Sequence, residues 1–248
     1  VSRLSGRGLR RVNMKILLSP AKTFRRQPLP DVPAGQTPQY METTELLHEE
    51  LKKLTVDQWQ KQFKLSEKAA LENRARMNQP QPAAAALAAF HGEAFRNFQA
   101  ETLSAEDWRY CEEHLRILSA YYGLLRPLDF IRPYRLDPVD KAGTLTPLTL
   151  WKPLLRQALD GEEVLILASQ EYARMVDVSD AVTVQFVKNG RKAPSMEAKK
   201  LRGRMARQIV DQRITRRADV RSLDVAGYRY QRELSTAEVW VFAEGEQE

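Results

Sequence analysis

Two short apolar runs interrupt an otherwise mixed pattern of hydrophobic and polar positions. The segments 15–18 and 164–168 are mainly aliphatic, which predicts two strands buried on both faces. Each run is followed at once by serine and other polar side chains. Because ligands bind at the carboxyl ends of strands in open α/β sheets, we expect these side chains to share one cleft: Ser19 and Lys22 after the first strand, and Ser169, Glu171 and Tyr172 after the second. Each serine could instead close a turn or cap a helix.

Most of the remaining periodicity is helical. Apolar residues recur at three- and four-residue intervals after Ser or Thr caps, and predict helices over residues 43–54, 55–63, 66–78, 83–100, 104 to about 123, 148–159 and 196–214. Further short strands are predicted over 182–187, 222–225, 228–233 and 238–242, with a hairpin turn at Asn189-Gly190. These elements predict a mixed α/β (α+β) fold, in which a compact mixed sheet is surrounded by helices. We interpret residues 14–248 as a single domain.

Two glycines fall inside predicted helices. At such a position Gly92 and Gly203 each make the helix less stable than alanine would, by about 1 kcal/mol of free energy. We therefore expect a close backbone approach at Gly203, and either a close approach or a break at Gly92. The helices that end at Phe63 and begin after Ser66 resemble a helix-hairpin-helix, which would present backbone N–H groups to a phosphate, although the usual hairpin glycines are missing.

The segment 114–136 is rich in arginine, proline and aromatic residues. We interpret residues 114–123 as the end of a helix, closed by Gly123. Pro127 and Pro133 then predict a stiff elbow that carries Arg126, Arg132 and Arg135, interleaved with Tyr121, Tyr122, Phe130 and Tyr134. Arginines on a rigid backbone suit phosphates and carboxylates. The alternative, which remains open, is that they pair internally with Asp129, Asp137 and Asp140.

Charge is concentrated in two places. The net charge of the 248-residue chain is +7, and residues 191–217 hold ten basic residues against two acidic ones. Within this segment, Lys200, Arg204 and Arg207 follow a helical i, i+4, i+7 spacing, and Lys199 and Arg202 flank them. On a solvated helix face, positive and negative side chains would normally alternate. The excess of positive side chains therefore favours an anionic partner. The basic residues of 1–13 precede Met14, a natural start, and we interpret 1–13 as a disordered or misassigned extension.

Other classes of protein are disfavoured by composition. Cys111 is the single cysteine, which excludes an internal disulfide, and the three histidines are scattered. We therefore expect no metal site and no cofactor. No apolar run approaches the roughly 18 residues of a membrane span, so no membrane partner is expected.

Five blocks in order resemble the YaaA peroxide-stress protein family. They are Leu18-Ser19-Pro20-Ala21-Lys22-Thr23, the elbow itself, Leu167-Ala168-Ser169-Gln170-Glu171-Tyr172, the stretch 199–207 and Gly227-Tyr228-Arg229-Tyr230. The resemblance implies a cytoplasmic bacterial protein that responds to peroxide and limits free intracellular iron. It also implies an unusual mixed α/β fold with a basic cleft, a helix-hairpin-helix and duplex DNA binding, without a settled enzymatic activity. Asp137-Pro138-Val139, Ala243 and the hairpin depart from the family pattern.

Three functional hypotheses follow. The first is a monomeric, non-enzymatic or weakly catalytic DNA-binding protein that contacts phosphates without strong sequence preference through Arg126, Arg135, Lys199, Lys200, Arg202, Arg204 and Arg207. The second is an enzyme acting on a nucleotide or nucleobase in the cleft, with Glu171 as acid/base and Lys22 as anion anchor. Tyr122 and Tyr134 are expected to line that cleft as well. The third, direct iron binding through carboxylates, is disfavoured by the dispersed cysteine and histidines.

Overall fold

The computed structural model describes residues 14–79 and 81–245, so the extension interpreted as disordered or misassigned, residues 1–13, lies outside them. Within these residues the fold is mixed α/β, as the apolar pattern predicts, and a nine-stranded sheet forms its centre. Along the sheet the order is β4 (Gly123–Leu125), β3 (Leu115–Ser119), β1 (Met14–Leu18), β6 (Glu163–Leu167), β7 (Ala181–Lys188), β11 (Val239–Glu244), β10 (Tyr228–Tyr230) and β9 (Asp224–Val225), while β8 (Arg191–Lys192) pairs with β7.

The middle of the sheet is parallel and its edges are antiparallel. Strands β3, β1, β6, β7 and β11 run in one direction, whereas β4, β8, β9 and β10 pair antiparallel with their neighbours. The predicted hairpin is confirmed, because Asn189 and Gly190 both have positive φ between β7 and β8. A separate two-stranded sheet joins β2 (Ala84–Ala85) to β5 (Phe130–Ile131).

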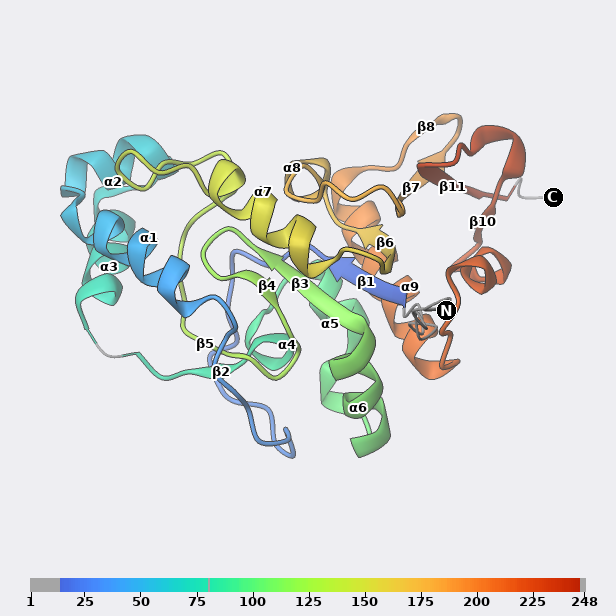
Figure 1. Ribbon diagram of the computed structural model, residues 1–248, viewed down its shortest axis with the longest axis horizontal. Helices are drawn as coiled ribbons and strands as arrows, with labels where there is room; N and C mark the ends of the chain where they lie inside the picture. The colour runs from blue at the N-terminus through green and yellow to red at the C-terminus, as the bar shows by residue number, and fades with distance from the viewer. Residues whose placement is uncertain (1–13, 80, 246–248) are drawn as a thin grey trace, which may run out of the picture.

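Helices surround this sheet (Figure 1). They are α1 (Met41–Lys53), α2 (Val56–Phe63), α3 (Glu67–Asn78), α4 (Ala86–Ala89), α5 (Glu93–Phe98), α6 (Ala105–His114), α7 (Pro147–Ala158), α8 (Gln170–Ala173) and α9 (Ser195–Asp211), with 3₁₀ turns η1 (Ala100–Thr102), η2 (Arg217–Ser222) and η3 (Arg232–Leu234). Helices α1 to α3 group at one end of the molecule, α7 crosses in front of β3 and β4, and α9 lies behind the strands. The prediction that α2 and α3 act as a helix-hairpin-helix stays a prediction.

The contact between α5 and α9 explains Gly203. A Cβ at this position would lie 2.0 Å from the carbonyl oxygen of Ala94. Only glycine therefore allows the two helices to approach this closely, and the predicted close approach is confirmed. The contact holds α9, which carries half of the basic residues of 191–217, against the body of the protein.

One predicted helix is broken. Residues 83–100 form β2, α4 and α5 instead of a continuous helix, because the loop after β1 pairs with the backbone here. The N–H of Arg25 donates to the Ala89 carbonyl over 2.7 Å, and the N–H of His91 donates to the Thr23 carbonyl over 2.9 Å. A Cβ at Gly92 would lie 2.8 Å from the Ala21 side chain. Both possibilities considered for Gly92, a break and a close approach, are therefore present.

The interpretation of residues 114–123 as a helix end was wrong. Helix α6 ends at His114, and the residues that follow form β3, which pairs in parallel with β1. The apolar residues of 115–119 satisfy both a helical spacing and a buried strand, and pairing with β1 decides between them. Gly123 does adopt the left-handed conformation, with φ +79, but it does so in the turn into β4.

Candidate functional site

Two serines meet at the carboxyl ends of β1 and β6. These strands pair in parallel with Leu18 opposite Leu167, so Ser19, one residue after β1, and Ser169, two residues after β6, reach the same edge. The Ser169 N–H donates to the Oγ of Ser19 over 2.8 Å, and the two hydroxyl oxygens lie 3.4 Å apart. They line a cleft of about 440 Å³ together with three other residues that the sequence assigned to it: Lys22, Glu171 and Tyr172.

Two carboxyl groups line this cleft near Lys22: Asp137, which follows the elbow, and Glu171 of α8. Asp137 pairs with Lys22 at 2.6 Å and accepts a hydrogen bond from the Tyr172 hydroxyl over 3.1 Å. The pKa of Glu171 is raised, first by burial and then by the negative charge of Asp137. The cleft thus holds a carboxyl group whose affinity for a proton is higher than usual, beside a paired lysine.

Helix α9 contributes cations to the same cleft. Lys199 and Arg202 both line it. The Nε of Arg202 is buried and makes no hydrogen bond to any residue that the structure describes, and burial lowers the pKa of the guanidinium. A buried donor without an acceptor is costly, so this side chain is suited to an anion that enters the cleft.

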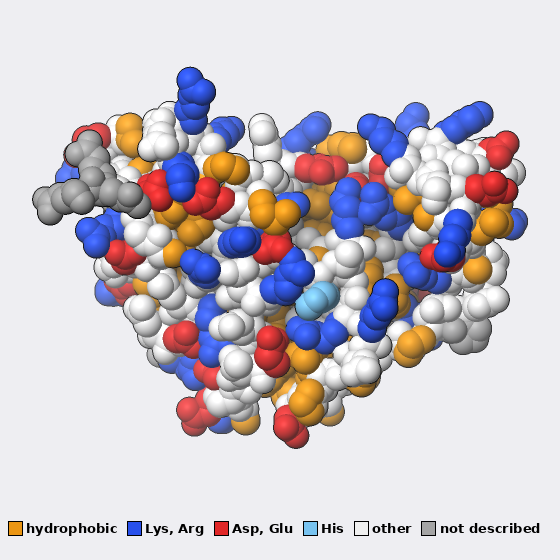
Figure 2. All heavy atoms as spheres, turned by 180° about the vertical axis from the view of Figure 1, so that it is seen from behind, with side chains coloured by type: hydrophobic (Ala, Val, Ile, Leu, Met, Phe, Trp, Pro, Cys, Tyr) orange, Lys and Arg blue, Asp and Glu red, His pale blue; other side chains and the backbone are white. Residues whose placement is uncertain are grey.

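The outer face of α9 carries further cations. Lys199, Lys200 and Arg204 are exposed, and Arg204 donates from Nε to the Asn97 side chain over 3.0 Å. Figure 2 views the molecule from behind, the side of α9, and shows Lys and Arg side chains gathered across the middle of this face. We call Lys199, Lys200 and Arg204 the α9 cation group.

Arg207 differs from the other members of the predicted stripe. Its side chain is 19% exposed and pairs with Asp211 at 2.7 Å. It also donates to the carbonyl oxygens of Phe98 and Gln99, over 3.3 and 3.0 Å. These bonds tie α9 to the end of α5, so the helical spacing alone did not distinguish an exposed cation from a structural one.

The elbow residues lie elsewhere. Arg126 forms an ion pair with the buried Asp129 at 2.8 Å and donates to the Thr37 carbonyl over 3.0 Å, so the internal-pairing alternative holds for this arginine. Tyr134 is buried and accepts a hydrogen bond from the Ser119 hydroxyl over 2.8 Å. Neither these residues nor Tyr122 and Arg135 are among the side chains that line the cleft. Arg135 is half-buried, and burial raises the pKa of the nearby Asp140 carboxyl, a rise that the positive charge of Arg135 only partly offsets.

Sequence reasoning missed two features of the cleft. Asp137 was considered only as a partner for the elbow arginines, but it pairs with Lys22, more than one hundred residues earlier in the chain. The amino-terminal turn of α5, with Gly92 and Glu93, forms another wall. No local signal identifies either feature, because both depend on tertiary packing. Among the described residues, no group of three or more His, Cys, Asp or Glu side chains could hold a metal ion, and no helix is long and apolar enough to cross a membrane.

Together these features define a mixed α/β protein with a cleft at the carboxyl ends of two parallel strands, lined by three basic and three acidic side chains. Comparison with known proteins places it in a family. The model of the family described as peroxide stress protein YaaA matches residues 14–234. The UPF0246 protein Mmar10_0828 of Maricaulis maris (strain MCS10) is 37% identical over 245 residues, covering 90% of this chain and 93% of that protein. The chain belongs to the YaaA peroxide stress protein family, and membership relates it to the response to peroxide.

Proposed function

We propose that the protein binds duplex DNA without strong sequence preference, through the α9 cation group and the adjoining cleft. The observation that carries the proposal is the absence of carboxylate partners: no ion pair within 4.0 Å joins Lys199, Lys200 or Arg204 to any described acidic residue. Cations on one rigid helix that are not neutralised internally are available to phosphates. Arg202 would supply a further contact at the cleft, whereas Arg126 and Arg207 are engaged within the protein.

Direct binding measurements test this proposal. Fluorescence anisotropy with two labelled duplexes of equal length and unrelated sequence should give nearly equal dissociation constants, because phosphate contacts carry no sequence information. Replacing Lys199, Lys200 and Arg204 together by alanine should weaken the binding of both duplexes by about tenfold or more. A strong preference for one duplex, or unchanged affinity of the variant, would oppose the proposal.

The relation to iron belongs to the same proposal. As the family relationship suggests, we expect a cytoplasmic monomer that helps to limit free intracellular iron during peroxide stress. Whole-cell electron paramagnetic resonance of chelatable iron tests this part. Cells whose only copy carries the three alanines should accumulate more free iron under peroxide than cells with the unaltered protein. Equal free-iron levels in the two kinds of cell would show that iron control does not depend on DNA binding by the α9 cation group.

A second candidate function is an enzyme acting on a nucleotide or nucleobase in the cleft. It is favoured by one observation, the raised pKa of Glu171 beside the Lys22–Asp137 pair. In this reaction Glu171 would exchange a proton with the substrate, and Arg202 would hold its phosphate. Incubation with nucleotides, modified nucleosides and damaged duplexes would reveal turnover. Turnover that is abolished by Glu171→Gln, with duplex binding intact, would support the enzyme; no turnover of any of them would oppose it.

A further inference from the structure

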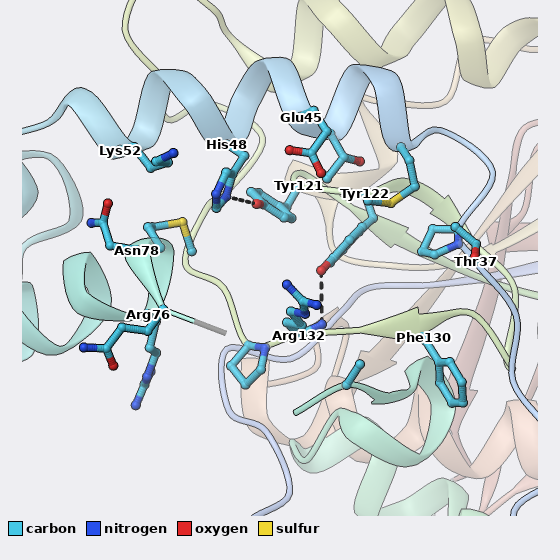
Figure 3. Close-up of a pocket in the computed structure, with 17 residues that line it drawn as sticks. Thr37, Glu45, His48, Lys52, Arg76, Asn78, Tyr121, Tyr122, Phe130 and Arg132 are labelled. Carbon is cyan, nitrogen blue, oxygen red and sulfur yellow. Dashed lines mark hydrogen bonds between the residues drawn. The ribbon is translucent and has the colours of Figure 1, made fainter. Parts of the chain in front are cut away.

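A second cavity lies at the opposite end of the sheet from α9. It has a volume of about 720 Å³ and shares none of its lining residues with the cleft of Ser19 and Ser169. Its walls come from α1, the end of α3, the turn between β3 and β4, and the segment that follows β5 (Figure 3). The volume falls in the range of pockets that bind small molecules. None of the functions proposed above uses it.

A tyrosine and a histidine form a fixed polar pair in this cavity. The Tyr121 hydroxyl lies 2.7 Å from Nδ1 of His48, as Figure 3 shows. Tyr121 is only 6% exposed, and its ring stacks on Tyr134 with centroids 5.1 Å apart. Burial raises the pKa of the phenol, so it keeps its proton. The pair has two arrangements, and in one of them the phenol donates to Nδ1 of a neutral His48. A neutral His48 then carries its own proton on Nε2, where it is a donor for a ligand.

The charge of the cavity is mainly positive. Lys52, Arg76 and Arg132 line it against one carboxylate, Glu45. Lys52 pairs with Glu49 at 3.0 Å, but neither Arg76 nor Arg132 forms a side-chain ion pair or hydrogen bond with any residue in the described segments. Guanidinium groups without carboxylate partners, in a concave site, are well suited to a phosphate.

An exposed aromatic ring completes the site. Phe130 is 46% exposed and lines the cavity. One part of its ring packs on Gly35, where a Cβ would lie 2.3 Å from Cε1. The glycine thus holds the ring in place while the rest of it stays uncovered. A partly uncovered ring at a fixed position is a stacking surface for a flat heterocycle.

We propose that this cavity binds a nucleotide 5′-monophosphate, with the phosphate between Arg132 and His48 and the base on the exposed ring of Phe130. The same chemistry exists in a free nucleotide and at the 5′-phosphorylated end of a nucleic-acid strand. The site is independent of the α9 cation group, since the two have no residue in common.

Isothermal titration calorimetry of the full chain with deoxyadenosine monophosphate tests the proposal. Arg132→Gln should weaken binding by about tenfold or more, because a charge-assisted hydrogen bond is lost. Arg191→Gln, which removes the same charge from the exposed strand β8, should leave binding unchanged. His48→Gln, at a half-buried position, should weaken binding as well and provides a second variant.

Further ligands distinguish a free nucleotide from the 5′-phosphorylated end of a nucleic-acid strand. Deoxyadenosine and inorganic phosphate should each bind more weakly than the nucleotide. A single-stranded oligonucleotide is then compared with and without its 5′-phosphate. If the phosphorylated form binds more tightly, and Arg132→Gln removes this difference, the strand end is the ligand. The proposal is overturned if neither the nucleotide nor the phosphorylated strand binds, if Arg132→Gln has no effect, or if inorganic phosphate binds as tightly as the nucleotide.

Discussion

The backbone N–H of Ser169 donates a hydrogen bond to the Oγ of Ser19 over 2.8 Å, although the two residues are 150 positions apart. The bond joins the carboxyl ends of β1 and β6, at the point where the polar residues of the two strands line one cleft. It therefore fixes the geometry on which the cleft depends.

Loss of this hydrogen bond should lower the stability of the folded protein by a measurable amount. Ser19→Ala leaves the Ser169 N–H, which is partly buried, without its acceptor. We expect the free energy of unfolding in urea to fall by about 1–2 kcal/mol. Ser179→Ala, at an exposed serine of the loop before β7, is the matched control and should have little effect. Equal stability of Ser19→Ala and the control would mean that the bond contributes nothing.

Because α5 and α9 pack so closely, replacing glycine by alanine at Gly203 should destabilise the protein, the opposite of its usual effect in a helix. Alanine is favoured over glycine within a helix by about 1 kcal/mol, so Gly203→Ala would stabilise an uncrowded helix. Here the new Cβ would meet the Ala94 carbonyl oxygen, and we expect a net loss of about 1–3 kcal/mol in the free energy of unfolding. Gly245→Ala, where the nearest atom would be 3.9 Å away, serves as the control. A more stable Gly203→Ala protein would disprove the crowding.

The raised pKa of Glu171 has a consequence for stability against pH. Above its ordinary value of 4.5, this carboxyl is ionised in the unfolded chain while it still holds its proton in the folded protein. The folded state then binds more protons, so its stability falls as pH rises from 4.5 through the folded pKa. Glu171→Gln stays neutral and lacks this fall.

Urea unfolding at a series of pH values measures the effect. The stability of Glu171→Gln relative to the unaltered protein should increase as pH rises above 4.5 and then level off. Shifts of carboxyl groups that do not interact with Glu171 cancel in this difference, whereas those of Asp137 and Asp140 are part of the effect. Glu106→Gln, at a side chain that is 75% exposed, should show no such trend. A difference that is constant with pH would contradict the raised pKa.

The parts of the site that could be predicted from sequence are those set by local pattern. The apolar runs before Ser19 and Ser169 identify the two strand ends, because few short segments are so uniformly aliphatic. The cost of glycine within a helix identified the packing at Gly203. Both follow from properties of the residues themselves, independent of their partners.

The arginines show where such reasoning stops. Arg126 and Arg202 are equally basic in sequence, yet one pairs with Asp129 and the other has a buried Nε without a partner. Arg204 and Arg207 share a helical stripe and both donate hydrogen bonds to α5 or its end, yet only Arg207 also pairs with a carboxylate, that of Asp211. Which guanidinium is neutralised depends on backbone oxygens and carboxylates that the fold brings near, and no spacing along the chain encodes it. The assignment of 115–119 to β3 depends in the same way on β1.

The salt dependence of duplex binding tests most directly whether the α9 cation group contacts phosphates. The logarithm of the binding constant falls linearly with the logarithm of salt concentration, with a slope of about 0.9 per neutralised phosphate. Replacing Lys199, Lys200 and Arg204 by alanine should flatten this slope by about 2.7 if each makes one contact. A matched variant that removes Arg109, Lys152 and Arg156 loses the same charge from α6 and α7 and should keep the original slope. If both variants keep that slope, or if both flatten it equally, α9 is not the surface that binds DNA.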